Sequence, residues 1–272
     1  MYRSVVNVTT ADGLLAIADP ALGGLPNGIS VDLGADFRAI GLRLGMPVVV
    51  SRTTAAVPDV QLQIDIGSAA RWSPTIGSRP EGDGRPIARW RARSGAVWTM
   101  AGVRGAANGF GPLLRREASR SRGLDVAGRA SASIADLCRS LRHHDRVGSV
   151  RAARGLVGLG EGLTPSGDDF LAGFVAALWT LGSPDAGLLA DAIVDRDERT
   201  TMVSGTLLQH AAKGEFAERI HELMGALLDI DDVGIAESIE RAVAWGASSG
   251  TDCLLGALVG LDLVTETSAG VA

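Results

Sequence analysis

The sequence is poor in cysteine and has no long apolar run. Its 272 residues include two cysteines, Cys138 and Cys253, which are too few for a disulfide framework or a four-ligand zinc site. The longest apolar stretch, residues 170–181, is interrupted by Gly173 and falls short of the ~18 residues that a membrane span needs. The first residues lack the basic stretch and apolar block of a secretory signal. We therefore expect a cytoplasmic protein with no membrane partner.

Lysine and aromatic residues are also scarce. Lys213 is the single lysine among 26 basic residues, and aromatic side chains make up 4% of the chain. Residues 1–155 carry 21 basic and 12 acidic side chains, whereas residues 156–272 carry 5 and 19. This asymmetry suits either an arginine-rich face that docks an acidic partner or two halves that attract each other. Because the arginines are scattered and lack interleaved aromatics, we expect no nucleic-acid partner.

Several common catalytic motifs are missing as well. The chain has no Gly-x-Ser-x-Gly nucleophile elbow, and His221-Glu222 lacks the second histidine of a helical zinc site. Neither cysteine has the basic surroundings typical of a reactive thiolate. What remains is ordinary globular composition, with 46% hydrophobic and 21% charged residues. Any chemistry must therefore come from a less familiar arrangement.

Residues 1–110 predict a β-rich N-terminal domain. Short runs rich in strand-forming residues alternate with Gly, Pro and Asn turn signals, and residues 61–66 alternate polar and apolar side chains as a half-buried strand does. Seven short strands at this spacing are typical of a barrel or a sandwich. The expected strands are residues 5–9, 14–18, 29–33, 47–51, 60–66, 87–91 and 97–103.

Residues 111–272 predict a mostly helical C-terminal domain, so the expected fold class is α+β. Apolar residues such as Ile220, Leu223 and Leu227 recur at helical spacing. The expected helices are residues 113–121, 131–144, 168–181, 186–197, 199–213, 215–229, 233–246 and 250–264.

The most informative segment is the glycine-rich stretch 155–170, which leads into an apolar helix. Five of its residues are glycines, which let a ligand approach the main chain closely. Ser166 is suited to be the N-cap of the helix, with Asp169 completing a capping box. Capping is thus one explanation of this pattern. It does not account for Asp168, nor for Gly167, which is a poor residue inside a helix.

The spacing from Gly162 to Gly167 copies that of a phosphate-binding P-loop, but Asp168 and Asp169 stand where lysine and serine or threonine belong. Two carboxylates repel a bare phosphate, so a P-loop nucleotide site is excluded here. At a helix N-terminus we expect both to be ionised and therefore poor general acids. They are better suited to accepting hydrogen bonds from an amide or to holding a magnesium ion. Thr164 adds a hydroxyl beside them.

A similar segment occurs later in the chain. Residues 166–173 and 249–256 agree at five positions with a constant offset of 83, including a shared Ser-Gly-x-Asp pattern. One hypothesis is that two helix N-termini face one pocket, each with amides, a hydroxyl and a carboxylate, and bind a small polar substrate. The alternatives are two well-capped helices or the remnant of a helical duplication.

A third segment, residues 199–204, carries Arg199 beside the acidic Asp195, Asp197 and Glu198. The guanidinium is suited to clamping a carboxylate or phosphate in a bidentate manner. A surface salt bridge within the acidic run is an equal alternative.

The sequence of residues 158–169 resembles the central motif of the AllH family, as do residues 199–201, Ser204 and residues 248–252. The resemblance implies a subunit of an oxamate carbamoyltransferase in allantoin breakdown, which works with FdrA-like and AllG-like partner subunits. The implied reaction is phosphorolysis of a carbamoylated amide such as oxalurate, with phosphate and a small carboxylate amide as ligands. The alternative is a non-catalytic subunit that binds a small anion. One departure is Ala247, where the family often has histidine.

The resemblance also implies roles for individual residues, with no certain cofactor and Mg²⁺ as the one candidate. Hydroxyls and amides would contact the anion or oxyanion, and carboxylates would orient an amide or a metal. The expected catalytic residues are Thr164, Ser166, Asp168, Asp169 and Asp252, and the expected substrate-binding residues are Gly160, Gly162, Gly167, Arg199, Ser249, Gly250 and Thr251.

Overall fold

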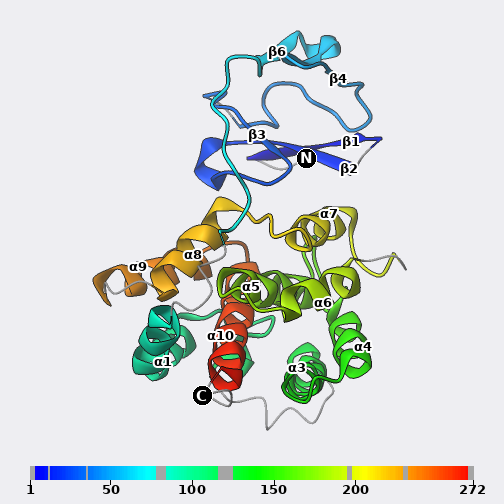
Figure 1. Ribbon diagram of the computed structural model, residues 1–272. Coiled ribbons are helices and arrows are strands. Elements are labelled where there is room, and N and C mark those ends of the chain that lie inside the picture. The colour runs from blue at the N-terminus through cyan, green and yellow to red at the C-terminus, as the bar shows by residue number, and fades with distance from the viewer. Residues whose placement is uncertain are drawn as a thin grey trace. The chain divides into compact units, whose positions relative to one another are not determined.

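The computed structural model describes residues 4–11, 13–34, 36–77, 84–115, 125–194, 198–228 and 232–268. Along the chain these residues fall into two compact units, which divide between Pro74 and Thr75. The first unit holds small β-sheets and the second is helical (Figure 1). The predicted α+β class, with its β-rich part first, is therefore confirmed.

The first unit contains two three-stranded sheets that do not close into a barrel. In one sheet β1 pairs antiparallel with β2, which pairs parallel with β3, and in the other β4, β5 and β6 are antiparallel. A small apolar cluster that includes Val8, Ile17, Phe37 and Ile64 joins the inner faces of the two sheets. The strands are β1 (Val5–Thr10), β2 (Gly13–Ala18), β3 (Gly28–Ser30), β4 (Val49–Val50), β5 (Thr54–Val57) and β6 (Leu62–Asp65).

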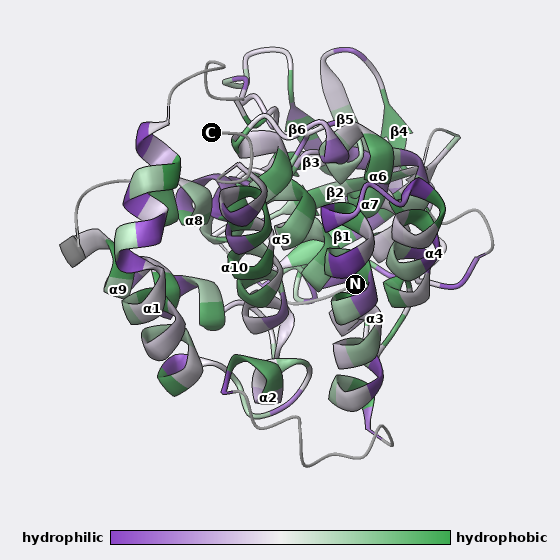
Figure 2. Ribbon diagram, turned by 60° about the horizontal axis from the view of Figure 1, so that its bottom comes forward, coloured by the Kyte–Doolittle hydropathy of each residue, from purple (hydrophilic) through white to green (hydrophobic). Residues whose placement is uncertain are grey.

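The second unit is built around two adjacent helices, α5 and α10, with further helices on either side (Figures 1 and 2). Both central helices are buried along nearly their whole length, which explains why they are apolar on all faces. The helices are α1 (Arg85–Arg104), α2 (Gly111–Leu114), α3 (Val126–Arg142), α4 (Arg146–Leu156), α5 (Ser166–Thr180), α6 (Asp185–Ile193), α7 (Met202–Ala211), α8 (Glu218–Leu228), α9 (Asp232–Val243) and α10 (Ser249–Thr267).

Glycines let α5 and α10 cross at backbone contact. A Cβ on Gly173 would lie 1.9 Å from the carbonyl oxygen of Cys253, and one on Gly256 would lie 1.9 Å from that of Phe170. These two contacts are related by the same 83-residue offset that relates the sequence segments. The crossing is therefore symmetric, and it fixes the two helices against each other near their N-termini.

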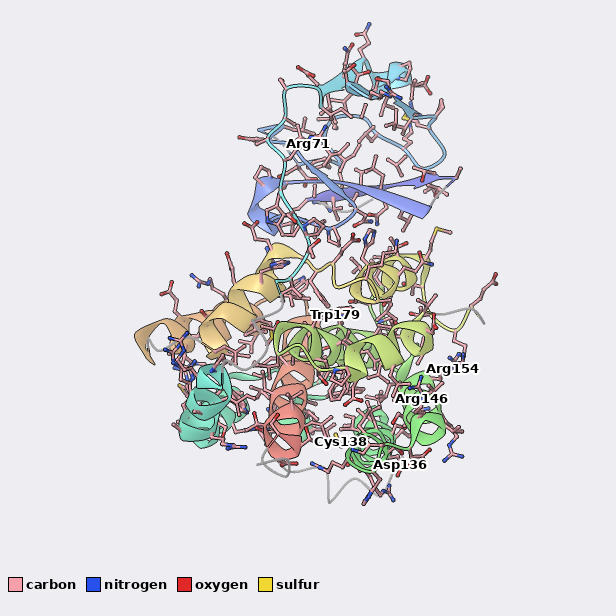
Figure 3. The ribbon with its side chains drawn as sticks, in the orientation of Figure 1. Arg71, Asp136, Cys138, Arg146, Arg154 and Trp179 are labelled. Atoms are coloured by element: carbon pink, nitrogen blue, oxygen red, sulfur yellow. The ribbon has the colours of Figure 1, made fainter. Side chains whose placement is uncertain are left out.

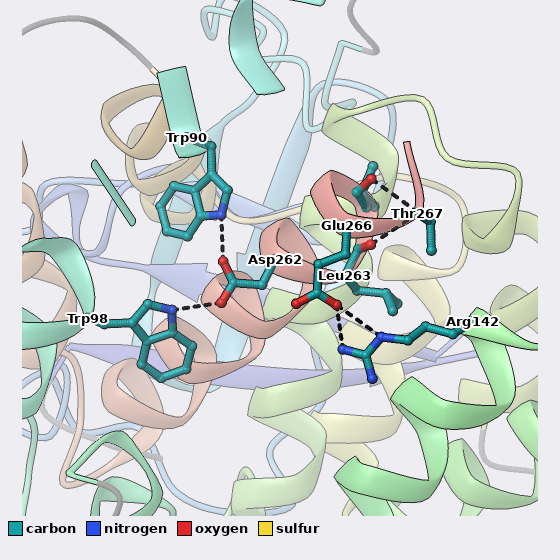
Figure 4. Close-up of polar contacts among 8 residues, drawn as sticks. Trp90, Trp98, Arg142, Asp262, Leu263, Glu266 and Thr267 are labelled. Carbon is teal, nitrogen blue, oxygen red and sulfur yellow. Dashed lines mark hydrogen bonds and ion pairs between the residues drawn. The ribbon is translucent and has the colours of Figure 1, made fainter. Parts of the chain in front are cut away.

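The strands expected at residues 87–91 and 97–103 are wrong, because both segments belong to helix α1. Its buried residues Trp90, Val97 and Ala101 are seven and four positions apart, which places them on one face of a helix. The indoles of Trp90 and Trp98 donate hydrogen bonds of 2.7 and 2.9 Å to the two carboxylate oxygens of Asp262 on α10 (Figure 4). These bonds anchor α1 to the central helix.

The other expected helices are confirmed with shifted ends, apart from those that extend into residues 116–124, 195–197 and 229–231, outside the described part. Helix α4 was not expected. Both cysteines are free and buried, with Cys138 on α3 (Figure 3), and burial raises the pKa of the Cys138 thiol to about 11. No helix among the described residues is long and apolar enough to cross a membrane.

Candidate functional site

Helices α5 and α10 begin in the same way, and neither begins with a capping side chain. Ser166 and Ser249 are the first helical residues, and the N-cap residues Pro165 and Ser248 make no side-chain capping bond. The predicted capping box, with Ser166 as N-cap, is therefore wrong. The hydroxyl of Ser166 instead acts to lower the pKa of Asp252 on the other helix.

The second residue of each helix is a glycine because the preceding loop packs directly onto it. The amide of Gly167 donates to the carbonyl of Leu159 at 2.8 Å, and the amide of Gly250 donates to that of Trp245 at 2.9 Å. A Cβ on Gly250 would lie 1.6 Å from the carbonyl oxygen of Ala242. The amides of Gly167 and Gly250 are thus engaged within the chain, which leaves neither of them for the anion contact that the sequence suggested.

The two helix starts lie close together. Thr164, in the loop before α5, lies 2.9 Å from Ser249 on α10, oxygen to oxygen. The hydroxyls of Ser249 and Thr164 act to lower the pKa of Asp169 on α5, and that of Ser166 on α5 acts to lower the pKa of Asp252 on α10. The two helix N-termini therefore lie near each other, and a shared substrate pocket between them stays a prediction.

Burial controls the protonation of this carboxyl pair. It raises the pKa of Asp169 to about 8, against the hydrogen bonds from Ser249 and Thr164, and the nearby carboxylates of Asp252 and Asp168 raise it further. Burial likewise raises the pKa of Asp252, which has no exposed surface. This direction runs against the expectation that Asp169 is ionised as a helix-terminal carboxylate, because burial disfavours the charged form.

One oxygen of each carboxyl group accepts no hydrogen bond within the described structure. The Oδ2 atoms of Asp169 and Asp252 are buried and have no hydrogen-bond partner within the described structure. The Oδ1 atom of Asp252 accepts from the backbone amide of Phe110 at 2.7 Å. Buried acceptors are normally satisfied by protein groups or ordered water, and these two oxygens meet no protein donor among the described residues.

Asp168 has a different position from Asp169, although the two are adjacent in sequence. Its carboxylate accepts from the amide of Gly158 at 2.8 Å and from the hydroxyl of Ser204 at 2.7 Å, and it also accepts from the hydroxyl of Thr200. These bonds tie the glycine-rich loop to the start of α7. Asp168 thus organises the loop through these bonds, and its charge also raises the pKa of the neighbouring Asp169.

The glycine-rich loop itself bends as its composition predicts. Gly160 and Gly162 have φ angles of +122° and +100°, which side chains rarely adopt. A Cβ on Gly160 would lie 2.8 Å from the backbone nitrogen of Ser166, whereas Gly162 faces open space. The tip of this loop, residues 161–163, is exposed beside the helix starts.

Sequence reasoning missed a third component, the loop of residues 105–110 between α1 and α2. The amide of Ala106 donates to the hydroxyl of Thr251 at 3.0 Å, and Phe110 binds Asp252 as described. Gly109 has a φ of +58°, and a Cβ there would lie 2.7 Å from both carboxylate oxygens of Asp252. The Asn108-Gly109 dipeptide is a turn signal, but nothing in it indicates that the turn covers a carboxyl group 143 residues away.

The loop before α7 is joined to the site, but Arg199 is directed elsewhere. Its Nη1 donates to the carbonyl oxygen of Arg154 at 2.7 Å, in the last turn of α4 (Figure 3). Thr201 caps α7 through the amide of Ser204 and donates to the carbonyl of Leu163. The alternative salt bridge of Arg199 within the acidic run involves Asp195 and Asp197, which lie outside the described residues, and Glu198. A substrate contact of Arg199 stays a prediction.

Within the described part of the chain, no group of three or more His, Cys, Asp or Glu side chains is placed to hold a metal ion. The arrangement instead offers the buried carboxyl group of Asp252, the partly buried carboxyl group of Asp169, three hydroxyls and three exposed loops beside the two helix starts. The third exposed loop contains Gly246 and Ala247, just before α10.

Two parts of the chain match models of known protein families. Residues 156–261, which span both helix starts, match the model of oxamate carbamoyltransferase subunit AllH. Residues 1–71 match the AllH family N-terminal domain. No solved structure matches the chain. The two matches lie on either side of the division between the two structural units. Together they show that this chain belongs to the AllH family.

Proposed function

We propose that this chain is the subunit of a carbamoyltransferase that carries an acid–base site, and that it moves a carbamoyl group between phosphate and a small amide such as oxamate. The observation that carries the proposal is the carboxyl pair Asp169 and Asp252 at the joined starts of α5 and α10. The description of the family as a carbamoyltransferase subunit supports it.

The reaction balances without a nucleophilic side chain. An oxygen of phosphate attacks the ureido carbonyl carbon of oxalurate, and the bond from that carbon to the amide nitrogen breaks. The products are carbamoyl phosphate and oxamate, and the departing nitrogen must gain a proton. A general acid with a pKa near the working pH serves this step best.

Asp169 is the residue suited to this step. Because burial raises its pKa to about 8, it holds a proton at neutral pH and donates it to the leaving nitrogen. In the direction of oxamate carbamoylation, the same carboxylate takes the proton back. The hydroxyls of Thr164, Ser166 and Ser249 surround the pair and supply donors for negative charge that develops on the carbonyl oxygen.

Partner subunits form part of this proposal. The family description names a subunit, so we expect activity only when the chain is assembled with the others, which the resemblance identifies as FdrA-like and AllG-like. Allantoin breakdown in the cytoplasm is the setting that this implies. Thr251, Gly250 and Asp168 then hold the loops in place around the reacting groups.

The test is an assay of carbamoyl phosphate formed from oxalurate and phosphate, with the chain alone and with each combination of partners. We expect Asp169→Asn to lower the rate by about 10²- to 10⁴-fold, the usual contribution of a general acid. Asp185→Asn is a matched control, because Asp185 is a partly buried carboxyl at the start of α6. Wild-type rates in Asp169→Asn would refute the assignment, and ligand binding without turnover in every combination would indicate a non-catalytic binding subunit.

A further inference from the structure

The outer face of helix α4 carries positive charge that the described chain does not neutralise. The helix contains three arginines, Arg146, Arg151 and Arg154, and no acidic residue. All three are exposed, and none of them forms an ion pair with another residue of the described chain. Figure 3 shows Arg146 and Arg154 at the outer edge of the helical unit. Their guanidinium groups therefore face solvent with their charge uncompensated.

An exposed apolar side chain lies among these arginines. Val147 is 77% exposed, and Arg151 and Arg154 follow it at four and seven positions, which places the three side chains on one face of the helix. The buried residues of α4 lie on its other face. A protein interface typically combines an apolar centre with arginine, which is enriched there while lysine is depleted. The face thus has the composition of a docking surface.

The position of Arg146 does not serve the stability of the helix. It is the first residue of α4, where the helix dipole disfavours a cation. The neighbouring carboxylate of Asp145 is engaged as the N-cap and accepts from the amide of Gly148 at 2.9 Å. A basic residue at this position therefore points to a partner outside the chain.

We infer that this face of α4, defined by Arg146, Val147, Arg151 and Arg154, docks an acidic segment of a partner subunit. The inference rests on the proposed function in one respect, since the occupant is a subunit of the same carbamoyltransferase. The family description names a subunit and so implies a partner chain. Carboxylates on that chain complement the three guanidinium groups, because arginine binds a carboxylate through two parallel hydrogen bonds. An apolar side chain of the same segment covers the valine.

A nucleic acid fits this face less well than an acidic protein. Phosphates pair with guanidinium groups, but they offer nothing to cover Val147. Helix α4 also has no aromatic side chain on which a base could stack. The observations therefore favour a protein, and a nucleic acid becomes one outcome of the test.

The docking face is joined to the candidate site through the main chain. The carbonyl oxygen of Arg154 accepts from Nη1 of Arg199, in the loop before α7, at 2.7 Å. Helix α4 ends at Leu156, and two residues later the amide of Gly158 donates to Asp168. A partner that binds α4 therefore contacts the helix from which the glycine-rich loop starts.

The test measures binding of the full chain to each purified partner subunit, FdrA-like and AllG-like, by surface plasmon resonance. One variant carries Arg146→Glu and Arg151→Glu. The matched control carries Arg43→Glu and Arg52→Glu, at two exposed arginines of the first unit that form no ion pair within the described chain. For at least one subunit we expect the α4 variant to raise Kd by about tenfold or more at about 0.15 M salt, and the control to leave it unchanged. The difference should shrink at about 1 M salt, where charges are screened beyond ~3 Å.

A second pair of variants tests the apolar centre. Val147→Asp places a negative charge in the middle of the face, so we expect it to weaken binding of the same subunit. Val103→Asp is the control, because Val103 on α1 is 79% exposed. Urea unfolding of the arginine variant reports on the fold. Its stability should not fall, because the helix dipole favours glutamate at the position of Arg146.

An unchanged Kd in both α4 variants, or equal losses in these variants and their controls, would overturn the inference. So would binding of duplex DNA that the arginine variant loses while it still binds the subunits normally, because the face would then belong to a nucleic acid. Assembly that depends on the α4 arginines but yields no carbamoyl phosphate would support the inference and refute the proposed function. Full activity in an assembly that tolerates both α4 variants would do the reverse.

Discussion

Replacing Asp169 with asparagine changes how stability depends on pH, and the sign follows from burial. In the unfolded chain the carboxyl ionises near its ordinary pKa of 3.8, whereas in the folded protein it keeps its proton until about pH 8. The folded state therefore binds more protons over this window, and stability falls as pH rises through it. Each pKa unit corresponds to about 1.4 kcal/mol, so the full loss is on the order of 5 kcal/mol. An asparagine side chain at this position has no charge to bury, so the variant lacks this contribution.

Urea unfolding of both proteins at a series of pH values between 4 and 9, roughly the window of this titration, measures the effect. We expect the asparagine variant to gain stability relative to wild type as pH rises, by several kcal/mol near the alkaline end. A smaller slope remains in the variant because burial also raises the pKa of Asp252. Asp185→Asn serves as a control, since Asp185 is less buried than Asp169. Parallel curves for wild type and Asp169→Asn would show that Asp169 is ionised in the folded protein, and the general-acid role would fall with it.

Two further substitutions test the parts that hold the pair. Gly109→Ala should lower oxamate binding strongly while the fold survives, because its Cβ would displace the carboxylate of Asp252. Gly34→Ala is the control: Gly34 has a similar positive φ and open space around it, so this variant reports only the ~1–2 kcal/mol backbone cost. Equal effects of the two substitutions would contradict this reasoning. Asp262→Ala removes the acceptor of two indole N–H groups on α1 and should lower the free energy of unfolding by roughly 2–5 kcal/mol in urea titrations. A loss below ~1 kcal/mol would mean that these bonds do not anchor α1.

The fold class and the order of its two parts could be predicted from the spacing of apolar residues. Polar and apolar residues alternate at residues 61–66, as in a strand buried on one face, and Leu223 and Leu227 recur at the spacing of a helix buried on one face. Helix α1 was misassigned because its β-branched and aromatic residues resemble strands when read in short windows. Its true period appears only when Trp90, Val97 and Ala101 are compared over the whole segment.

The site could be predicted only in part, for a physical reason. The Ser-Gly-x-Asp repeat identified both helix starts, since glycine and short polar residues are required there by close backbone approach. The protonation of Asp169 could not be predicted, because it depends on burial by segments distant in sequence. The contact of Gly109 with the carboxylate of Asp252 could not be predicted for the same reason. Nor could the internal role of Asp168, which depends on hydrogen bonds from the hydroxyls of Thr200 and Ser204.

The backbone contacts of Gly173 with Cys253 and of Gly256 with Phe170 limit how this site can diversify. Where two main chains touch, the separation of the helices is set by atoms that every amino acid shares, so mutation cannot tune it in small steps. The spacing of the two helices that carry the carboxyl groups should therefore stay constant within the family. A change of substrate would require changes in the sequences of the three surface loops, so related proteins with other substrate preferences should differ first in these loops.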